Sequence, residues 1–177
     1  SNIVFKEEST SFDVVVNEQS QRATITLAGK HNVLNALGAR EIAHKVSNDL
    51  EGSCNAIAKF EGVGRRFEKL YQENQFVIVD DYAHHPTEIK ATINTAKSKY
   101  PTKKIIVIFE PHRFSRTKEH WSEFVECFEK VDKAYIAPIY AASETPIEYI
   151  DSEILVKNIS EKSGNAVSIE SWGELPD

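Results

Sequence analysis

Four titratable side chains lie within six residues of one another, directly after an apolar run of the sequence. The apolar run is Phe76–Val79, and the titratable residues are Asp80, Asp81, His84 and His85. Carboxylates and imidazoles exchange protons and hydrogen-bond to polar ligands near neutral pH. The cluster therefore predicts either a solvated turn or the polar rim of an active site.

A second polar cluster follows the next apolar run, Ile105–Phe109. It contains His112, Arg113 and Arg116. Ligands of open parallel sheets bind outside the carboxyl ends of the strands. If the two runs are neighbouring strands, we expect both clusters to share one crevice.

The chemistry that such a crevice favours is the binding of an anion. Two guanidinium groups three residues apart can bind a carboxylate or a phosphate in bidentate geometry, and helix N-termini behind both clusters would add partial positive charge. The alternatives are that Arg113 and Arg116 pair with surface acids, and that one of His84 and His85 caps a helix while the other packs. Zinc is disfavoured because these two histidines are adjacent and no HExxH or Cys-rich spacing accompanies them.

The sequence contains no self-sufficient cradle for a triphosphate. The stretch Gly29-Lys30-His31 lacks the upstream glycine and the following Ser or Thr of the GxxxxGK[ST] motif, and no other stretch matches it. Arg65 and Arg66 could instead reach a phosphate from the side, or could be a solvated basic pair at a domain border.

Regular elements must position these clusters, and hydrophobic periodicity predicts where they lie. The first part of the chain predicts two antiparallel strands, a helix capped by Asn32 and a second helix, at residues 11–16, 23–27, 33–42 and 56–60. Gly62 and Gly64 mark a boundary, after which strands and helices alternate. The predicted strands are 76–79, 105–109, 134–139 and 166–169, and the predicted helices are 86–98, 117–130 and 152–162.

This alternation predicts an α/β fold. Three strands begin at residues 76, 105 and 134, a spacing of 29 residues that matches the roughly 30 residues of a βαβ unit. Continuous apolar strands between amphipathic helices indicate a parallel sheet covered on both faces. The helix 117–130 carries an apolar stripe at helical spacing, formed by Trp121, Phe124, Val125 and Phe128.

Composition excludes several classes of function. The formal net charge is −6, whereas nucleic-acid binding needs basic surface that displaces counterions, so we expect no nucleic-acid partner. No apolar run approaches the roughly 20 residues that span a bilayer, and the N-terminus does not resemble a signal peptide. The two cysteines, Cys54 and Cys127, form no CxxC pair, which predicts buried, reduced thiols and a cytosolic protein.

Four motifs occur in order along the chain. They are GKHNVLNA at residues 29–36, GVGRRFE at 62–68, DDYAHHPTE at 80–88 and PHRFSRT at 111–117. Together they strongly resemble the Mur ligases. The combination of the third and fourth motifs is the most specific part of the resemblance, which extends from about Phe12 to about Ile169.

Members of that family contain an N-terminal domain for the UDP-sugar, a central ATPase domain with a P-loop, and a C-terminal Rossmann-like domain. The resemblance implies that residues 1–64 are the C-terminal portion of the central ATP-binding domain, a small α+β piece, and that residues 65–177 are the Rossmann-like domain, truncated at its end. It also implies that the P-loop and the magnesium ligands lie outside this chain, which would be inactive alone. The absence of an initiating Met likewise favours a fragment.

The resemblance further implies an activity. The parent enzyme would be an ATP-dependent acid–amino-acid ligase that adds L-alanine to UDP-N-acetylmuramate during peptidoglycan synthesis in the bacterial cytoplasm. ATP, with Mg²⁺, would phosphorylate the muramate carboxylate, and the amine of alanine would attack the acyl phosphate through a tetrahedral intermediate. The partners of the chain would be these small molecules and the remaining domains of the same polypeptide.

Carried over residue by residue, the resemblance divides the motifs between two ligands. Those near ATP would be His31, Asn32 and Asn35 at the adenine, Arg66 at the phosphates and Asp81 at the ribose. Those at the amino acid would be Tyr82, His84, His85, His112, Arg113 and Arg116. Catalytic roles would fall to His84, Arg113 and Arg116, because the arginines would hold the carboxylate and stabilise charge that develops in the intermediate.

Three alternatives remain open from the sequence. A recycling ligase would add a whole tripeptide to the same sugar acid, although the HRFSR wording of residues 112–116 favours the alanine enzyme. A non-catalytic Rossmann-like module would bind a nucleotide or a partner. A metal-dependent hydrolase would use Asp80, Asp81, His84 and His85.

Overall fold

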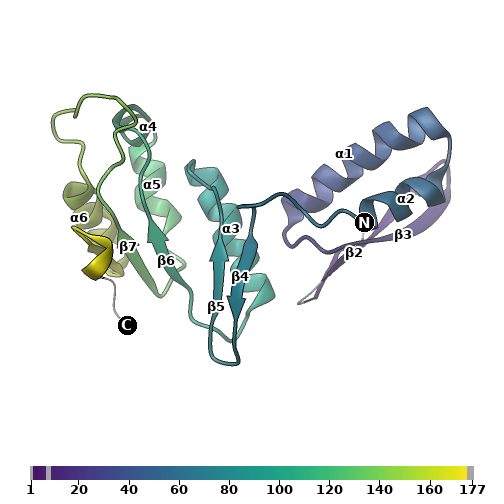
Figure 1. The fold of residues 1–177 in the computed structure, drawn as a ribbon, viewed down its shortest axis with the longest axis horizontal. Coiled ribbons are helices and arrows are strands. Elements are labelled where there is room, and N and C mark those ends of the chain that lie inside the picture. Colours follow the sequence, from purple (N-terminus) through teal and green to yellow (C-terminus); the bar gives the residue numbers. More distant parts are fainter. Residues whose placement is uncertain (1, 7–8, 175–177) are drawn as a thin grey trace. The chain divides into compact units, whose positions relative to one another are not determined.

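Two compact units make up the chain. Figure 1 shows the computed structural model, which describes residues 2–6 and 9–174. The first unit contains Ser1–Tyr82 and Asn94–Pro101, and the second contains Ala83–Ile93 and Thr102–Asp177. Each unit has its own buried core. Among the described residues, no helix is both long enough and apolar enough to cross a membrane.

The first unit begins with an antiparallel sheet covered by two helices. Its elements are β1 (Val4–Phe5), β2 (Thr10–Val16), β3 (Gln19–Ile25), α1 (Lys30–Ser47) and α2 (Leu50–Ala58). Asn17 and Glu18 connect β2 to β3, and both have positive φ, of 47° and 67°. Two such residues make the tight turn whose twist matches a hairpin. The predicted strands are therefore confirmed, although the second starts earlier than its apolar residues suggested.

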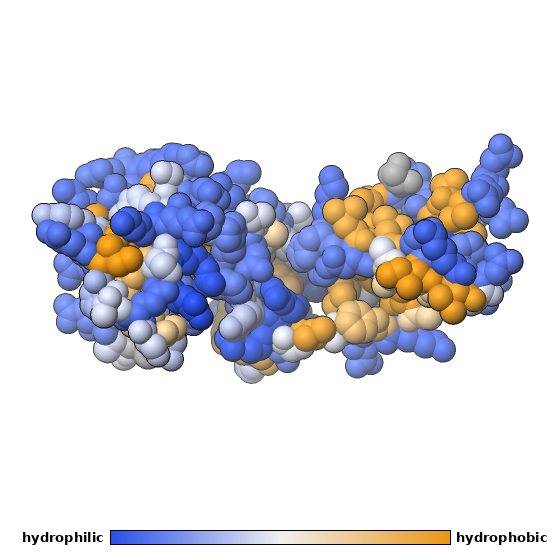
Figure 2. Space-filling view, turned by 90° about the horizontal axis from the view of Figure 1, so that it is seen from above, coloured by the Kyte–Doolittle hydropathy of each residue, from blue (hydrophilic) through white to orange (hydrophobic). Residues whose placement is uncertain are grey.

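The core of this unit lies between the sheet and the helices. Alternate residues of β2 and β3 point inwards, as expected for a sheet with one buried face. The buried apolar residues are Phe12, Val14, Ala23, Ile25, Val33 and Cys54. On the opposite side of α1, Leu34, Ile42 and Val46 are exposed. Orange surface gathers over the α1 and α2 side of this unit in Figure 2.

The start of α1 differs from the prediction that Asn32 caps this helix. The cap is Gly29, whose φ of 95° lies in the left-handed region that favours glycine. The amide nitrogen of Asn32 donates to the carbonyl of Ala28 at 2.7 Å, so this side chain does not accept a free N–H of the first turn. The capping prediction was wrong because the helix begins two residues before Asn32.

The run at residues 76–79 forms strand β5 (Val77–Asp80), but its pairing differs from the prediction. It pairs antiparallel with β4 (Glu68–Gln72), which sequence periodicity missed, and not with the next apolar strand. The residues between β4 and β5 close a hairpin in which the rings of Tyr71 and Phe76 stack 5.5 Å apart. A short local connection favours this pairing, because it costs little loop entropy.

The second unit contains a parallel sheet with flanking helices, as Figure 1 shows. Strands β6 (Ile106–Phe109), β7 (Lys133–Ile136) and β8 (Ala166–Ser168) lie in that order. The helices are the first part of α3 (Pro86–Lys99), together with α4 (Phe114–Glu119), α5 (Trp121–Cys127) and α6 (Ser152–Ser163). This arrangement confirms the predicted α/β fold class.

One face of this sheet is buried and the other is not. The buried face belongs to a core whose largest members are Phe109, Phe124, Phe128, Ile136, Leu155 and Ile159. On the other face, the side chains of Ile106 and Ile108 remain 61% and 51% exposed. Within the described residues, the predicted cover on both faces is therefore not found for β6.

The predicted helix 117–130 is two helices. The chain leaves helical geometry at His120, where φ is −109° and ψ is 27°, and α5 resumes at the next residue. The apolar stripe nevertheless packs as predicted. Phe124 and Phe128 are fully buried, and Trp121 and Val125 pack against the same core.

Buried Asn165 ties the end of α5 to the sheet. Its amide nitrogen donates to the carbonyls of Phe128 and Val131 at 2.9 and 2.8 Å. We expect Asn165→Ala to lower the free energy of unfolding by about 1–3 kcal/mol, because two buried carbonyls lose their donor. Urea unfolding followed by tryptophan fluorescence measures this change. Asn158→Ala is the control, because the amide of Asn158 bonds only within its own helix.

Candidate functional site

The two adjacent histidines directly precede helix α3. The ring nitrogen Nδ1 of His85 accepts the backbone N–H of Thr87 at 3.2 Å, and Oε2 of Glu88 accepts the N–H groups of His84 and His85 at 3.0 and 3.2 Å. This exchange is a capping box with histidine in the capping position. One part of that alternative is thus confirmed, since His85 caps its helix. Because Nδ1 accepts a hydrogen bond, neutral His85 carries its proton on Nε2.

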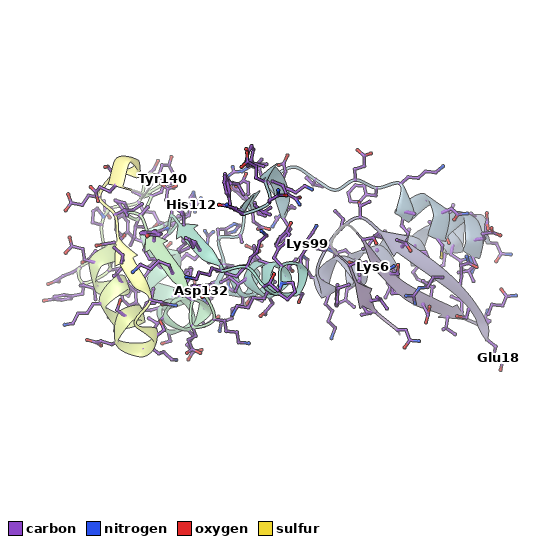
Figure 3. The ribbon with its side chains drawn as sticks, turned by 90° about the horizontal axis from the view of Figure 1, so that it is seen from below. Lys6, Glu18, Lys99, His112, Asp132 and Tyr140 are labelled. Atoms are coloured by element: carbon purple, nitrogen blue, oxygen red, sulfur yellow. The ribbon has the colours of Figure 1, made fainter. Side chains whose placement is uncertain are left out.

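The segment after β6 is held beside the segment after β7. The backbone N–H of Tyr140 donates to Pro111 at 2.8 Å, and the N–H of Arg113 donates to the carbonyl of Tyr140 at 2.9 Å. The rings of His112 and Tyr140 stack 5.3 Å apart, and both residues are labelled in Figure 3. The polar residues that follow β6 therefore have a fixed backbone.

The two arginines of this segment have different surroundings. Nη1 of Arg116 donates to the carbonyl of His112 at 3.1 Å and lies 3.4 Å from its Nδ1. Arg113 is exposed, and no hydrogen bond or ion pair within the described residues engages its side chain. Arg113 also has a φ of 76°, an uncommon value for a residue with a side chain. Such outliers are often found where a side chain must point at a ligand.

His112 stands in a positively charged environment. Burial lowers the pKa of His112 below its ordinary value, and the nearby charges of Arg116, Arg113 and His84 lower it further. His84 and His112 are therefore close enough to interact, although they come from different polar clusters. A neutral imidazole and two guanidinium groups make this place suited to a carboxylate or phosphate.

The pKa of His112 provides a test of this cluster. We expect the His112 ring to titrate below 6.5 in the 177-residue chain, and Arg116→Ala to move the midpoint upwards because a repelling charge is removed. The neutral ring is favoured in the folded state. Its contribution to stability is thus present above about pH 6.5 and is lost as the pH falls through the lowered pKa.

Proton NMR of the histidine ring resonances measures the midpoint, with His112→Gln assigning the signal. Lys118→Ala is the matched control, because it removes an exposed positive charge from the same helix. A midpoint at or above 6.5 would contradict the described cluster.

A separate pocket, with a volume of about 430 Å³, lies in the first unit. Of the residues predicted to contact a nucleotide, Asn32 and Arg66 line it. His31 and Asn35 are exposed one turn apart on α1. Asp81 contributes to the loop beside the pocket, since its carboxylate accepts the N–H of Phe67 at 2.8 Å.

Tyr82 belongs to the first unit, as do the residues predicted to contact a nucleotide. The guanidinium carbons of Arg65 and Arg66 lie 5.0 and 6.0 Å from the centre of its ring, a cation–π arrangement. The other five residues predicted for the amino-acid site belong to the second unit. The sequence thus grouped Tyr82 with side chains that the structure places in another unit.

Sequence reasoning missed several residues at both places. Lys69 and Lys99 line the 430 Å³ pocket, and Lys99 also lies 5.9 Å from the centre of the Phe67 ring. Lys99 is the last residue of the amphipathic helix α3. Its position at the end of that helix is the feature of the sequence from which it could have been found. Tyr140 follows β7 as His112 follows β6, so the rule on strand ends could have found it. Within the described residues, no group of three or more His, Cys, Asp or Glu side chains is arranged to hold a metal ion.

Comparison with known protein families shows to which family the chain belongs. The family model described as "Mur ligase, glutamate ligase domain" matches residues 65–177. The chain belongs to the Mur ligase family. The match covers the β4–β5 hairpin and all of the second unit, including both polar clusters.

Individual Mur ligases are similar over most of the chain. UDP-N-acetylmuramate–L-alanine ligase from Solidesulfovibrio magneticus is 47% identical over 140 residues, which is 79% of this chain and 31% of the relative. The enzyme of the same name from Oleidesulfovibrio alaskensis is 39% identical over 161 residues, or 90% of this chain and 36% of the relative. The chain thus spans about a third of the length of these Mur ligases.

Solved structures of Mur ligases have the same fold. UDP-N-acetylmuramate–alanine ligase from Thermotoga maritima superposes with a TM-score of 0.77 at 25% identity, over 94% of this chain and 35% of that one. MurF from Acinetobacter baumannii gives a TM-score of 0.75 at 17% identity, over 98% of this chain and 36% of that one. The second likeness is one of fold alone.

Proposed function

We propose that the chain is part of an ATP-dependent ligase that joins L-alanine to the carboxylate of UDP-N-acetylmuramate in bacterial peptidoglycan synthesis. The observation that carries this proposal is the 47% identity to a UDP-N-acetylmuramate–L-alanine ligase over 140 residues. The site supports it, because an alanine carboxylate is the kind of anion that paired guanidinium groups bind. The same identity favours alanine over a tripeptide as the amine.

The reaction forms one amide bond and cleaves one phosphoanhydride. ATP transfers its terminal phosphoryl group to the muramate carboxylate, and the neutral amine of alanine then attacks that carbonyl. A tetrahedral intermediate forms, phosphate leaves with the bonding electrons, and the amine gives up a proton. The reaction takes place in the bacterial cytoplasm in this proposal, and the remaining domains of the polypeptide supply the UDP-sugar site.

The second unit holds the amino acid in this reaction. Arg113 and Arg116 bind the alanine carboxylate, and their charge stabilises the oxyanion of the intermediate. His84 and His112 line the same place, and the neutral imidazole of His112 leaves the arginine charge for the substrate. Fixing the amine beside the acyl phosphate is itself a large catalytic effect. His85 holds the cluster at the start of α3.

The first unit contributes to the nucleotide site. In this proposal residues 1–64 are the C-terminal portion of the central ATP-binding domain, and residues 65–177 are the Rossmann-like domain. The pocket lined by Asn32 and Arg66 fits part of a nucleotide, because it offers an amide and a guanidinium group. His31 and Asn35 extend the adenine contact, and Asp81 contacts the ribose. The described residues provide no set of ligands for Mg²⁺, so no step is assigned to that ion.

Phosphate release by the full-length enzyme tests the proposal. The assay contains ATP, Mg²⁺ and UDP-N-acetylmuramate, with single L- and D-amino acids or the L-Ala-D-Glu-diaminopimelate tripeptide as the amine. We expect release with L-alanine to exceed release with each of the others. Release only with the tripeptide would replace this function by the recycling reaction.

A further inference from the structure

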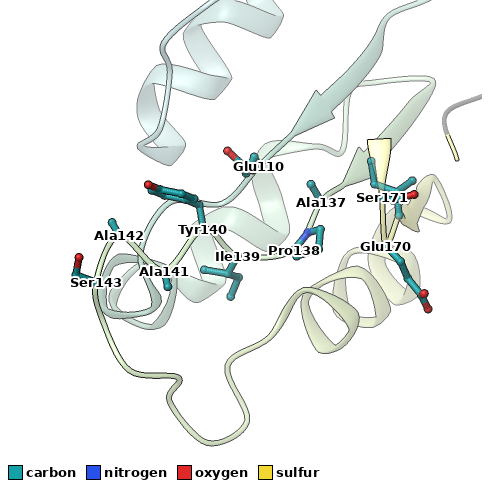
Figure 4. Close-up of a pocket in the computed structure, with 11 residues that line it drawn as sticks. Glu110, Ala137, Pro138, Ile139, Tyr140, Ala141, Ala142, Ser143, Glu170 and Ser171 are labelled. Carbon is teal, nitrogen blue, oxygen red and sulfur yellow. The ribbon is translucent and has the colours of Figure 1, made fainter. Parts of the chain in front are cut away.

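The loop that follows β7 is hydrogen-bonded to the segment that carries Arg113 and Arg116. This loop comprises residues 140–144, and its first four residues also form a wall of an open pocket of about 620 Å³, shown in Figure 4. We propose that Glu144 is a positioning residue that fixes the Arg113–Arg116 segment for the carboxylate of the amino acid. This inference rests on the proposed function and adds a residue outside the motifs.

Glu144 holds the segment through both of its carboxylate oxygens. Oε2 accepts the backbone N–H of Ser115 at 2.9 Å, and Oε1 accepts the hydroxyl of Ser115 at 2.6 Å. These two contacts join residues that are 29 positions apart in the sequence. A carboxylate that accepts two hydrogen bonds from one residue restrains both its position and its orientation.

The segment needs a support of this kind because its own N-cap is poor. Arg113 occupies the capping position of α4, and its side chain makes no capping hydrogen bond. Arginine is not among the residues that cap helices well, and its φ of 76° adds strain. Glu144 satisfies the first turn from outside the helix, and its negative charge suits a helix N-terminus.

Tyr140 provides a second hold from the same loop. Its backbone is hydrogen-bonded to Pro111 and Arg113, and its ring stacks on His112. The loop therefore contacts the segment before and after the capping position. A tight turn keeps Glu144 in reach, since its N–H donates to the carbonyl of Ala141 at 3.0 Å.

The Glu144 carboxylate accepts hydrogen bonds from Ser115 and does not pair with the guanidinium group of Arg113 within the described residues. The hydrogen bonds from Ser115 hold the pKa of the Glu144 carboxyl below its ordinary value, and the charge of Arg113 lowers it further. Glu144 forms no ion pair with Arg113 within the described residues, so the guanidinium group keeps its hydrogen bonds for a ligand. Glu144 thus orients the arginine without neutralising it by contact.

The test compares Glu144→Ala with Glu144→Gln in the full-length ligase. Glutamine keeps an oxygen that can accept one hydrogen bond from Ser115, whereas alanine keeps none. We expect Glu144→Ala to raise the KM for L-alanine roughly 10-fold to 100-fold, because small misplacements of a positioning group have effects of this size. Glu144→Gln should raise the KM for L-alanine much less than Glu144→Ala does. The KM for ATP should stay within about twofold of the unaltered enzyme in both variants.

Glu148→Ala is the matched control, because it removes an exposed carboxylate from the same connection between β7 and α6. Hydrogen exchange of the Ser115 amide in the 177-residue chain tests the contact independently of activity. Faster exchange in Glu144→Ala with the higher KM supports the proposal. An unchanged KM for alanine, or equal increases for alanine and ATP, overturns it. Failure of the unaltered enzyme to use alanine overturns the proposed function instead, whatever the exchange result.

Discussion

On the proposed function, replacing Arg113 or Arg116 by alanine in the full-length enzyme should raise the KM for L-alanine about 100-fold. Hydrogen bonds to charged groups contribute about 1.5–3 kcal/mol each, and about 1.4 kcal/mol corresponds to a factor of ten. The KM for ATP should change by less than about threefold, because the proposed nucleotide contacts are made by other side chains, those of Asn32 and Arg66. Steady-state kinetics with each substrate varied in turn measure both constants.

Replacement by lysine should affect the two arginines differently. Lysine retains the charge but cannot reproduce the planar pair of donors. Arg116 also bonds to His112, so Arg116→Lys should disturb both the substrate and that ring. Lys118→Ala serves as the control, as it removes a positive charge of the same helix without a described contact. If the KM for alanine is unchanged in both alanine variants, the assignment of this pair is wrong.

Replacing Arg40 by leucine should raise the free energy of unfolding of the first unit by about 1–4 kcal/mol. The Arg40 side chain is 4% exposed, and its Nε and Nη1 atoms are buried with no hydrogen-bond partner among residues 2–6 and 9–174. Its Nη2 atom pairs with Glu41, which is itself 46% exposed. Burying a charge with two unsatisfied donors is costly, and leucine removes that cost while filling most of the space.

The effect should be confined to the first unit. Both tryptophans of the sequence fall in the second unit, and Trp121 packs against its core, so tryptophan fluorescence follows that unit. Far-UV circular dichroism reports on both units. We expect Arg40→Leu to move only the dichroism transition to higher urea. Lys45→Leu is the control, since the Lys45 side chain is 74% exposed and should change stability by less than about 0.5 kcal/mol. A fall in stability for Arg40→Leu would mean that the guanidinium group has a partner in solution.

Most elements could be predicted from the sequence because their apolar residues repeat at the period of a strand or a helix. The exceptions have physical reasons. Strand β4 is exposed along its whole length, so it lacks an apolar pattern. Strand β5 was expected in the parallel sheet because its composition suits a buried strand, whereas its pairing depends on the neighbouring hairpin. The break at His120 is a change in backbone angles that leaves the apolar stripe intact.

The candidate site was predicted in part. The motifs located the histidines and arginines, because those residue types are uncommon in such clusters. They did not reveal that His85 accepts a hydrogen bond as a helix cap, which depends on the ring orientation. Nor did they reveal Glu144, whose contact to Ser115 spans 29 positions. Periodicity and motif spacing relate residues that are close in the sequence, whereas Ser115 and Glu144 are close only in the folded unit.

Each core contains one cysteine, Cys54 in the first unit and Cys127 in the second, and both are free thiols. Burial raises the pKa of Cys127 to about 12 and also raises the pKa of Cys54. Because only an accessible thiolate reacts readily with an alkylating reagent, each sulfur is protected until its own unit opens. The two cysteines can therefore each report on the opening of one unit. Timed alkylation, followed by mass spectrometry of the two cysteine peptides, would record which half opens first and how often.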